Sequence, residues 1–233
     1  MRIAIFGANG ATGRLLAQQA LDAGNEVIAV TRRPSVFPVR RLRLHVFEAD
    51  VYDENAVSEA LAGCEAVLST LGIPFTRETV SVYSTGVTNI LAGMRHNAIR
   101  RLVVVSSSAT YPHYHADGGF LLNRVMQPLV TATIGKTTYA DMRRMEELVR
   151  TSGLDWTIVR PSGLFDLPEV TDYRTDENEA PGVFTSRADL AACMLAQLHD
   201  DRFLQKNVAV TTTAVRPSLL RLMLGEAFKK QPA

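Results

Sequence analysis

The sequence predicts an α/β protein, a single domain over residues 1–233 built on a doubly wound parallel sheet. Short runs of apolar, β-prone residues alternate with segments of helical periodicity almost to the end of the chain. These runs are continuously apolar, which is the pattern of strands covered by helices on both faces. The length of 233 residues suits one such domain.

The elements follow from the periodicity, in chain order. Strands are expected at the apolar runs 1–6, 26–31, 43–47, 66–69, 101–105, 154–160 and 207–212. Helices are expected where apolar residues recur every three or four positions, at 14–21, 53–61, 79–96, 139–151, 187–198 and 217–228. Ser152-Gly153 stops the helix at 139–151, and Thr185 or Ser186 caps the next one. Residues 166–184 are polar with two prolines and are expected to be a loop with short extended pieces.

The strongest local signal lies between the first strand and the first helix. Gly7, Gly10 and Gly13 have the spacing G-x-x-G-x-x-G. Glycines there let the backbone turn sharply and let a pyrophosphate approach the bare main chain, next to the N–H groups of the helix N-terminus. An ordinary turn without a ligand is the alternative, but the βαβ context favours a dinucleotide site of Rossmann type.

The end of the second strand distinguishes the two nicotinamide dinucleotides. An acid there would bind the ribose hydroxyl of NAD, whereas this chain has Thr31, Arg32 and Arg33 and no acid. A guanidinium can hold the 2′-phosphate of NADP with two hydrogen bonds, and Thr31 can add a third. The sequence therefore favours NADP(H). The alternative is a solvated basic turn before Pro34.

Composition limits the partners. The formal net charge of +1 gives no electrostatic reason to bind nucleic acid or an anionic membrane, and no apolar run is long enough to span a bilayer. The first strand begins too early for a secretory leader, and Cys64 and Cys193 are expected to be buried free thiols, so a cytoplasmic protein is expected. His113 and His115 alone make a poor metal site, and no metal is expected. The oligomeric state stays open.

Five motifs fall in a recognisable order along nearly the whole chain. They are Gly7-Ala-Asn-Gly-Ala-Thr-Gly-Arg14, Asp50-Val51, Ser106-Ser-Ser-Ala-Thr110, Ser152-Gly-Leu-Asp-Trp-Thr-Ile-Val-Arg-Pro161 and Ser186-Arg-Ala-Asp-Leu-Ala191. Together they resemble the atypical short-chain dehydrogenase/reductases with an NAD(P)H-binding fold, in particular the NmrA-like proteins and the biliverdin-IXβ/flavin reductases. The resemblance is specific for fold and cofactor but not for substrate.

The resemblance implies a cofactor site made of segments that follow successive strands. Its residues would be Gly7, Asn9, Gly10, Ala11, Thr12 and Gly13 at the pyrophosphate; Thr31, Arg32 and Arg33 at the 2′-phosphate; Asp50 and Val51 at the adenine; Leu71 and Gly72 at the ribose; and Ser106, Ser107, Pro161, Ser162 and Gly163 near the nicotinamide. On its own, Asp50 could equally cap the helix that follows it.

The resemblance also suggests catalytic residues. Ser108 matches the hydroxyl position after the fifth strand, and Tyr139-Ala-Asp-Met-Arg143 looks like the family's Tyr-x-x-x-Lys pair with arginine for lysine. If the helix is aligned on Glu146, however, Thr138 and Met142 take the tyrosine and lysine positions. Tyr139 is then either the proton donor or an aromatic packed beside the pocket. In the reductase-like branch, which lacks the pair, the proton comes largely from solvent.

These expectations describe an NADPH-dependent reductase of a small-molecule acceptor, a flavin, a quinone or a carbonyl compound. Substrate-pocket elements are expected in 110–138, including the apolar stretch 120–134, and in 161–186. The alternative is a non-catalytic NADP(H)-binding redox sensor that acts through a protein partner. A nucleotide-sugar epimerase or dehydratase is disfavoured, because the C-terminal part is short and the proton-relay pair is displaced.

Overall fold

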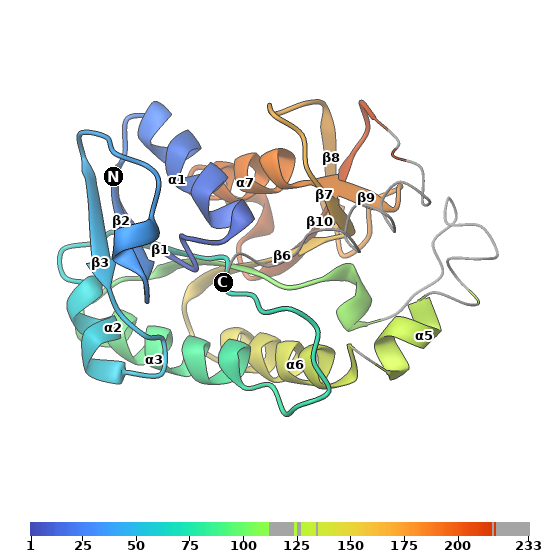
Figure 1. Ribbon diagram of the computed structural model, residues 1–233, viewed down its shortest axis with the longest axis horizontal. Coiled ribbons are helices and arrows are strands. Elements are labelled where there is room, and N and C mark those ends of the chain that lie inside the picture. Colours follow the sequence, from blue (N-terminus) through green and yellow to red (C-terminus); the bar gives the residue numbers. More distant parts are fainter. Residues whose placement is uncertain (112–123, 125–126, 134, 216, 218–233) are drawn as a thin grey trace.

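Eight strands form one sheet between two layers of helices (Figure 1). The computed structural model describes residues 1–111, 124, 127–133, 135–215 and 217. In spatial order the strands are β3 (Leu44–Glu48), β2 (Glu26–Thr31), β1 (Arg2–Phe6), β4 (Ala66–Ser69), β5 (Arg101–Val105), β6 (Asp155–Pro161), β10 (Lys206–Thr212) and β8 (Tyr173–Glu177). Neighbouring strands are parallel except β10 and β8. The predicted doubly wound parallel sheet is confirmed, with one antiparallel edge strand.

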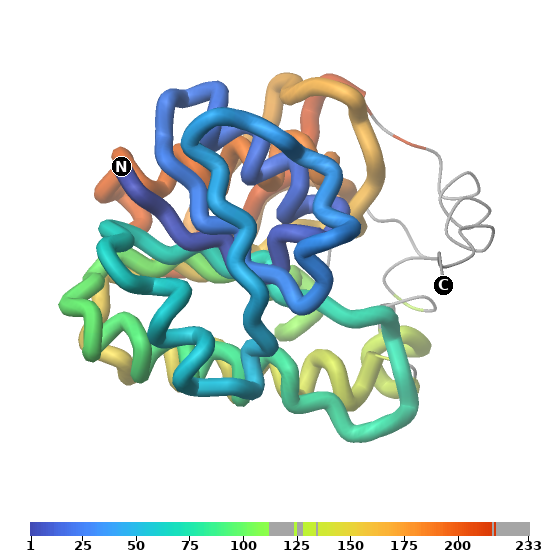
Figure 2. Tube along the Cα trace, turned by 60° about the vertical axis from the view of Figure 1, so that its left-hand side comes forward, coloured from blue at the N-terminus to red at the C-terminus, as the bar shows by residue number. Residues whose placement is uncertain are grey.

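Helices cover both faces of this sheet. One face carries α2 (Glu54–Ala60), α3 (Val82–His96) and α6 (Lys136–Arg150), and the other carries α1 (Ala11–Asp22) and α7 (Arg187–Ala196). Alternate strand residues enter the two layers: in β1, Phe6 packs in the α3–α6 layer and Ile5 in the α1–α7 layer. Figure 2 turns the molecule so that the β3 edge comes forward. The chain order reverses between β1 and β4, and such a switch point leaves a crevice at the carboxyl ends of the strands.

Short elements join these layers. They are η1 (Pro34–Val36), η2 (Ser108–Thr110), α5 (Gln127–Ala132), η5 (Asp201–Phe203) and a two-stranded parallel sheet of β7 (Gly163–Phe165) and β9 (Phe184–Ser186). The polar stretch 166–184, expected to be mainly loop, thus contains β8 and the start of β9. Its polar composition suits β8, because this strand lies at the edge of the sheet and most of its side chains are exposed.

Three helices begin three residues away from their predicted starts. α1 begins at Ala11 rather than 14, α6 at Lys136 rather than 139, and α3 at Val82 rather than 79. Ser186, one of the two expected caps, accepts a hydrogen bond from the Asp189 N–H and begins α7. The closing helix expected at 217–228 lies outside the described residues except for its first position, and much of the apolar stretch 120–134 lies outside them too.

The start of α3 is set by another helix. Ser81, at its N-cap position, makes no capping side-chain bond. Instead the buried carboxylate of Asp141, on α6, accepts hydrogen bonds from the backbone N–H groups of Tyr83 at 2.9 Å and Ser84 at 3.2 Å, and from the Ser84 hydroxyl. A negative charge at a helix N-terminus is favourable, and here it satisfies N–H groups that would otherwise be buried without partners. Because this cap comes from a residue far along the chain, local sequence signals miss it.

Replacing Asp141 should therefore weaken the contact between α3 and α6. We expect Asp141→Ala to lower the free energy of unfolding by about 1–3 kcal/mol, because two backbone donors lose their partner. Urea unfolding followed by circular dichroism measures the loss. The matched control is Glu147→Ala, an exposed carboxylate on the same helix, for which we expect a change within about 0.5 kcal/mol. Equal losses in the two variants would contradict the capping role.

Candidate active site at the carboxyl edge of the sheet

In the turn between β1 and α1 the main chain is packed so closely that two positions leave no room for a Cβ atom. Gly7 has φ +72°, and a Cβ on it would lie 2.6 Å from the carbonyl oxygen of Thr70. A Cβ on Gly13 would lie 2.3 Å from the carbonyl oxygen of Gly7. Among the described residues no side chain caps α1, whose N-cap is Gly10. The structure therefore presents bare backbone and uncapped N–H groups at the switch point of the sheet.

The turn also contains Asn9, which supports its shape, and Ala11 and Thr12, which are less buried than the glycines' neighbours in the core. The amide oxygen of Asn9 accepts hydrogen bonds from Nε and Nη2 of Arg14, at 3.0 and 2.6 Å, which ties the turn to the first turn of α1. Ala11 is exposed and Thr12 half-buried. The side-chain oxygen of Asn9 thus holds Arg14, and the contact of Asn9 with the cofactor stays a prediction.

Arginine side chains stand at the end of β2. The side chain of Arg32 is 70% exposed, and its nearest charged partner among the described residues is Asp50, with Nη1 3.8 Å from Oδ2. Thr31 is buried and its hydroxyl accepts a hydrogen bond from the Arg33 N–H at 3.2 Å, while Arg33 is exposed. Arg32 thus extends from the end of β2 with a single weak ion pair.

Asp50 does not cap the following helix. Its carboxylate accepts a hydrogen bond from the Tyr52 N–H, whereas Asp53 accepts from Ala56 and is the N-cap of α2. The alternative that Asp50 is a helix cap is therefore wrong, and its second carboxylate oxygen faces only Arg32 among the described groups.

Val51 and Leu71 come together against one glycine of α3. A Cβ on Gly86 would lie 2.9 Å from Cδ1 of Leu71 and 3.3 Å from Cγ2 of Val51. The glycine lets α3 approach closely enough for these two side chains to meet at the ends of β3 and β4. The sequence analysis missed Gly86, although a glycine in the middle of an amphipathic helix is a recognisable signal of close packing.

The three serines after β5 point to different places. The Ser106 hydroxyl is buried, donates to Glu146 at 2.6 Å and lies 3.1 Å from the Thr110 hydroxyl. The Ser107 hydroxyl accepts from the Ala109 N–H at 3.2 Å, and it lies near enough to the Tyr139 phenol to lower the pKa of that group. Ser108, the expected catalytic hydroxyl, begins η2 and is half-buried. The hydroxyl beside Tyr139 is therefore that of Ser107, which the sequence analysis assigned to the cofactor instead.

Tyr139 is packed into the N-terminal end of α6. Its ring lies 5.8 Å from that of Phe75, and a Cβ on Gly135 would lie 2.6 Å from it. Burial raises the pKa of the phenol above its ordinary value of 10.0, and the Ser107 hydroxyl opposes the rise. Arg143 is exposed and donates to the Thr110 carbonyl at 2.9 Å. The pairing of Tyr139 with Arg143, one of the two alternatives, which would lower the pKa of Tyr139, is therefore not formed.

Thr138 and Met142 occupy the buried face of the same helix. Thr138 is 1% exposed, and its hydroxyl has no hydrogen-bond partner among the described residues. The sulfur of Met142 accepts a weak bond from the Thr110 hydroxyl at 3.7 Å. A methyl-bearing hydroxyl and a thioether thus stand one helical turn apart, where a proton relay would need a phenol and an ammonium.

The loop after β6 closes this edge of the sheet. Pro161 is the last residue of β6, the Ser162 N–H donates to the Thr185 hydroxyl at 3.0 Å, and the Gly163 N–H donates to the Val183 carbonyl at 3.1 Å. Both N–H groups are used inside the protein, so the loop has a defined position. It follows the strand next to β5, and the Pro161–Gly163 loop and the serines thus lie at the same edge.

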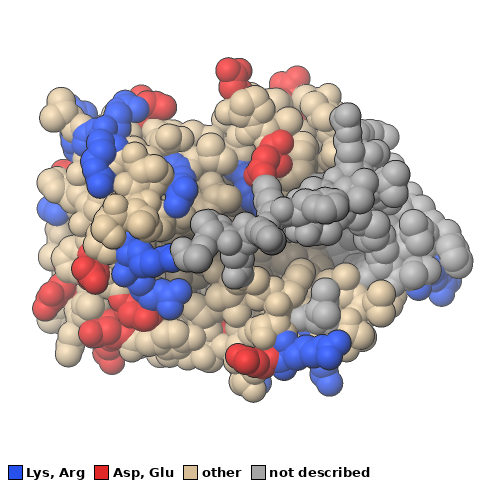
Figure 3. Space-filling view, viewed as in Figure 1, with Lys and Arg blue, Asp and Glu red and all other residues tan. Residues whose placement is uncertain are grey.

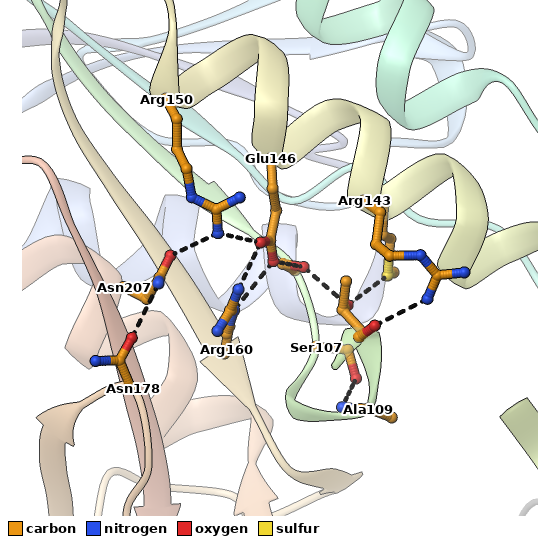
Figure 4. Close-up of polar contacts among 11 residues, drawn as sticks. Ser107, Ala109, Arg143, Glu146, Arg150, Arg160, Asn178 and Asn207 are labelled. Carbon is orange, nitrogen blue, oxygen red and sulfur yellow. Dashed lines mark hydrogen bonds and ion pairs between the residues drawn. The ribbon is translucent and has the colours of Figure 1, made fainter. Parts of the chain in front are cut away.

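A buried carboxylate joins the serine segment to β6 (Figure 4). Glu146 has no exposed surface and accepts hydrogen bonds from Ser106, from Arg150 at 2.5 Å and from two nitrogens of Arg160 at 3.0 and 2.5 Å. The ring of Tyr111 lies 4.8 Å from the Arg160 guanidinium carbon and 5.9 Å from that of Arg150. The sequence analysis used Glu146 only as an alignment anchor and missed this network.

The other expectations concern metals, thiols and the surface. Both cysteines are free and buried, as expected, and burial raises the pKa of Cys64 to about 11 and of Cys193 to about 12. Within the described ranges no three His, Cys, Asp or Glu residues gather as metal ligands, and no helix is long and apolar enough to cross a membrane; His113 and His115 lie outside those ranges. Figure 3 shows acidic and basic side chains interspersed on the described part of one face.

Known proteins resemble this chain in sequence and in fold. A family model described as NAD(P)H-binding matches residues 7–201. An oxidoreductase of Pestalotiopsis microspora is 27% identical over 230 residues, covering 89% of this chain and 84% of the relative. A (4-alkanoyl-5-oxo-2,5-dihydrofuran-3-yl)methyl phosphate reductase of Streptomyces griseus is 31% identical over 159 residues, covering 68% of this chain but only 46% of that protein. A short-chain dehydrogenase/reductase of Veillonella parvula, solved in complex with NADP, has a TM-score of 0.76 at 19% identity over 91% of this chain and 95% of that one.

These likenesses agree with the arrangement at the carboxyl edge of the sheet. The structural likeness supports the fold, and the names of the sequence relatives agree with an oxidoreductase. The matched range begins at Gly7, the first residue of the bare turn, and includes the serine segment and the Pro161–Gly163 loop. Since the family model spans most of the chain, residues 7–201, the chain belongs to the NAD(P)H-binding family.

Proposed function

We propose that the protein is an NADPH-dependent reductase of a small acceptor, which would be a flavin, a quinone or a carbonyl compound. The bare turn from Gly7 to Gly13 carries the proposal, because its two Cβ clashes leave room only for main chain beside the uncapped start of α1. A pyrophosphate can use those N–H groups. The reductase and oxidoreductase names of the sequence relatives support the reaction class.

Arg32 supports NADPH over NADH. It directly follows β2, where an NAD-preferring site would have an acid, and its side chain, 70% exposed, has among the described residues only a 3.8 Å ion pair with Asp50. A phosphate would offer a doubly charged partner with fork geometry in place of that weak pair. Asp50 would keep the oxygen not used by Tyr52 for the adenine amino group, with Val51 and Leu71 beside the ring.

The dinucleotide would supply a hydride at the end of β5. There Ser108 would orient the acceptor by a hydrogen bond, and the Pro161–Gly163 loop, fixed by Thr185 and Val183, would hold the amide end of the cofactor in place. Phe75 and Tyr139 would provide an apolar wall, because their rings pack together at the start of α6.

Proton transfer would depend little on the protein. The raised pKa of Tyr139 keeps its phenol protonated at neutral pH and makes it a weaker acid than a free tyrosine. No cation of α6 opposes this shift, since Arg143 is bound to the Thr110 carbonyl. We therefore infer that Tyr139 orients Ser107 and the wall of the pocket, and that solvent protonates the reduced acceptor.

A redox sensor is the second candidate. Its supporting observation is the pair Thr138 and Met142, which have no acid–base capacity at the positions where the resemblance places tyrosine and lysine. A sensor would bind NADP(H) through the same turn without turning over an acceptor.

The cofactor preference is testable at Arg32. The unmutated protein should bind NADPH more tightly than NADH, and Arg32→Ala should remove roughly one to two decades of that preference, since a charge-assisted hydrogen bond is worth about 1.5–3 kcal/mol. Titration of reduced-nicotinamide fluorescence gives the dissociation constants. Arg41→Ala, which removes an exposed arginine paired with Asp22, is the matched control and should leave the preference unchanged. Equal affinities in the unmutated protein would refute the assignment.

The role of Tyr139 is testable by removing only its hydroxyl. Tyr139→Phe should leave kcat within a few-fold of the parent, whereas loss of a general acid would cost on the order of 10²–10⁴-fold. Because the pKa of Tyr139 is raised above 10.0, the kcat profile should show no deprotonation of this group between about pH 6 and pH 9. A loss in the larger range, with NADPH affinity unchanged, would restore Tyr139 as proton donor.

Turnover separates the reductase from the sensor. We expect NADPH absorbance at 340 nm to fall under single-turnover conditions with at least one flavin, quinone or aldehyde, by hydride transfer within a closed site. A structure with NADP(H) bound should show an open, mostly apolar cavity bounded by Ser108, Tyr139 and the Pro161–Gly163 loop. A nicotinamide face covered by protein, with no oxidation by any acceptor, would favour the sensor.

A further inference from the structure

We infer that Arg150 and Arg160, beside the ring of Tyr111, form an oxyanion subsite for a carboxylate or phosphate group of the acceptor. The inference rests on the proposed reductase function and specifies the acceptor class: a molecule that carries an oxyanion some distance from the atom that receives the hydride.

The subsite adjoins the segments at which the acceptor is proposed to bind. Arg160 directly precedes the Pro161–Gly163 loop, and the Ser106 hydroxyl that shares Glu146 directly precedes Ser107. Tyr111 immediately follows η2, which Ser108 begins. Arg160 therefore lies next to both segments between which the acceptor is proposed to bind, and Arg150 shares Glu146 with it (Figure 4).

The charges of this subsite do not balance. Two guanidinium groups surround one carboxylate, Glu146, and the other donor to it, Ser106, is neutral. In the part of the chain that the structure describes, no second carboxylate lies within ion-pair distance of either arginine. Among the described residues one positive charge is thus left without a counterion, in a site where the arginine side chains are only 28% and 11% exposed. Partly buried charges need a partner, and an oxyanion would supply it.

Both guanidinium groups keep hydrogen-bond donors that Glu146 does not use. Arg160 donates hydrogen bonds from Nε and Nη2 to Glu146. Arg150 donates from Nη2 to Glu146 and, at 3.2 Å, to Asn207. A guanidinium has five N–H groups, so each arginine retains donors. Nη1 of Arg160 has no hydrogen-bond acceptor among the residues described.

Neighbouring side chains hold both arginines in place. The ring of Tyr111 lies against both guanidinium groups and its side chain also bonds Arg150. Asn207, itself bonded to Asn178 at 3.0 Å, holds the other side of Arg150. Arginines fixed in this way lose little side-chain entropy when they bind an anion.

A purely structural network would not need Arg150. Two nitrogens of Arg160 and the Ser106 hydroxyl already satisfy Glu146 and already join α6 to β5 and β6. Arg150 adds a surplus charge to this arrangement. It is therefore the residue to replace, since Glu146 keeps a partner when Arg150 is removed.

The binding experiment uses the full chain saturated with NADP⁺, which occupies the other anion-binding positions. Sodium phosphate and sodium acetate are each compared with sodium chloride at equal ionic strength, by the shift in Tm. We expect at least one oxyanion to raise Tm in the parent and in Arg144→Met, a charge-matched control on the same helix, but not in Arg150→Met. No advantage over chloride in the parent, or the same response in both variants, would overturn the subsite. Failure to bind NADP⁺ at all would instead refute the proposed function, and the anion comparison between the variants can still be read.

The kinetic experiment compares a carboxylate-bearing quinone with its methyl ester, with NADPH as reductant. The parent should prefer the carboxylate, and Arg150→Met should reduce the ratio of the two kcat/KM values by roughly ten- to a hundred-fold through KM, because a charge-assisted bond is lost. Arg150→Lys should restore part of the ratio, and Arg144→Met should leave it unchanged. An unchanged ratio in Arg150→Met would contradict the subsite, whereas absence of turnover with both quinones would count against the reductase itself.

Discussion

The close approach of α1 to β1 is the constraint on which the site depends. The Gly13 backbone sits so near the Gly7 carbonyl that a methyl group would be 2.3 Å from the oxygen. The end of β4 adds to this, because the Thr70 hydroxyl donates to the Phe6 carbonyl at 3.0 Å and to the Gly7 carbonyl at 3.2 Å. The turn is thereby held on both sides before any ligand arrives, so a dinucleotide would meet a preformed set of N–H groups.

Two buried carboxylates on α6 organise the other half of the molecule. Asp141 caps α3, and Glu146 joins the end of β5 to β6 through Ser106 and Arg160. Both are isolated from water and fully hydrogen-bonded, which is the condition under which buried charge is tolerated. The helix is therefore positioned by these anchors and does not rely on a tyrosine–lysine pair.

Because these two carboxylates position α6, residues other than tyrosine and lysine can occupy the proton-relay positions without loss of the fold. Thr138 is buried, Met142 contacts Thr110, Tyr139 packs against Phe75, and Arg143 reaches the Thr110 carbonyl. The wall of the proposed pocket would therefore be apolar and poor in acid–base groups. Such a wall suits acceptors whose reduction needs a hydride and an orienting contact more than a protein-derived proton. The proposed oxyanion subsite would then supply specificity at a distance from the reacting atoms.

The sequence by itself determined the parallel α/β sheet, the positions of its seven parallel strands and the bare glycine turn, because apolar periodicity and glycine spacing are local properties. Local signals could not place the cap of α3, the Val51–Leu71 contact on Gly86 or the Glu146 network, since each joins residues far apart in the chain. They also left the partner of Tyr139 open: only the packing of η2 against α6 showed that Ser107 lies near its phenol and that Arg143 donates to the Thr110 carbonyl. Spacing along one helix establishes which residues share a face, whereas burial and partners from other elements decide what those residues do.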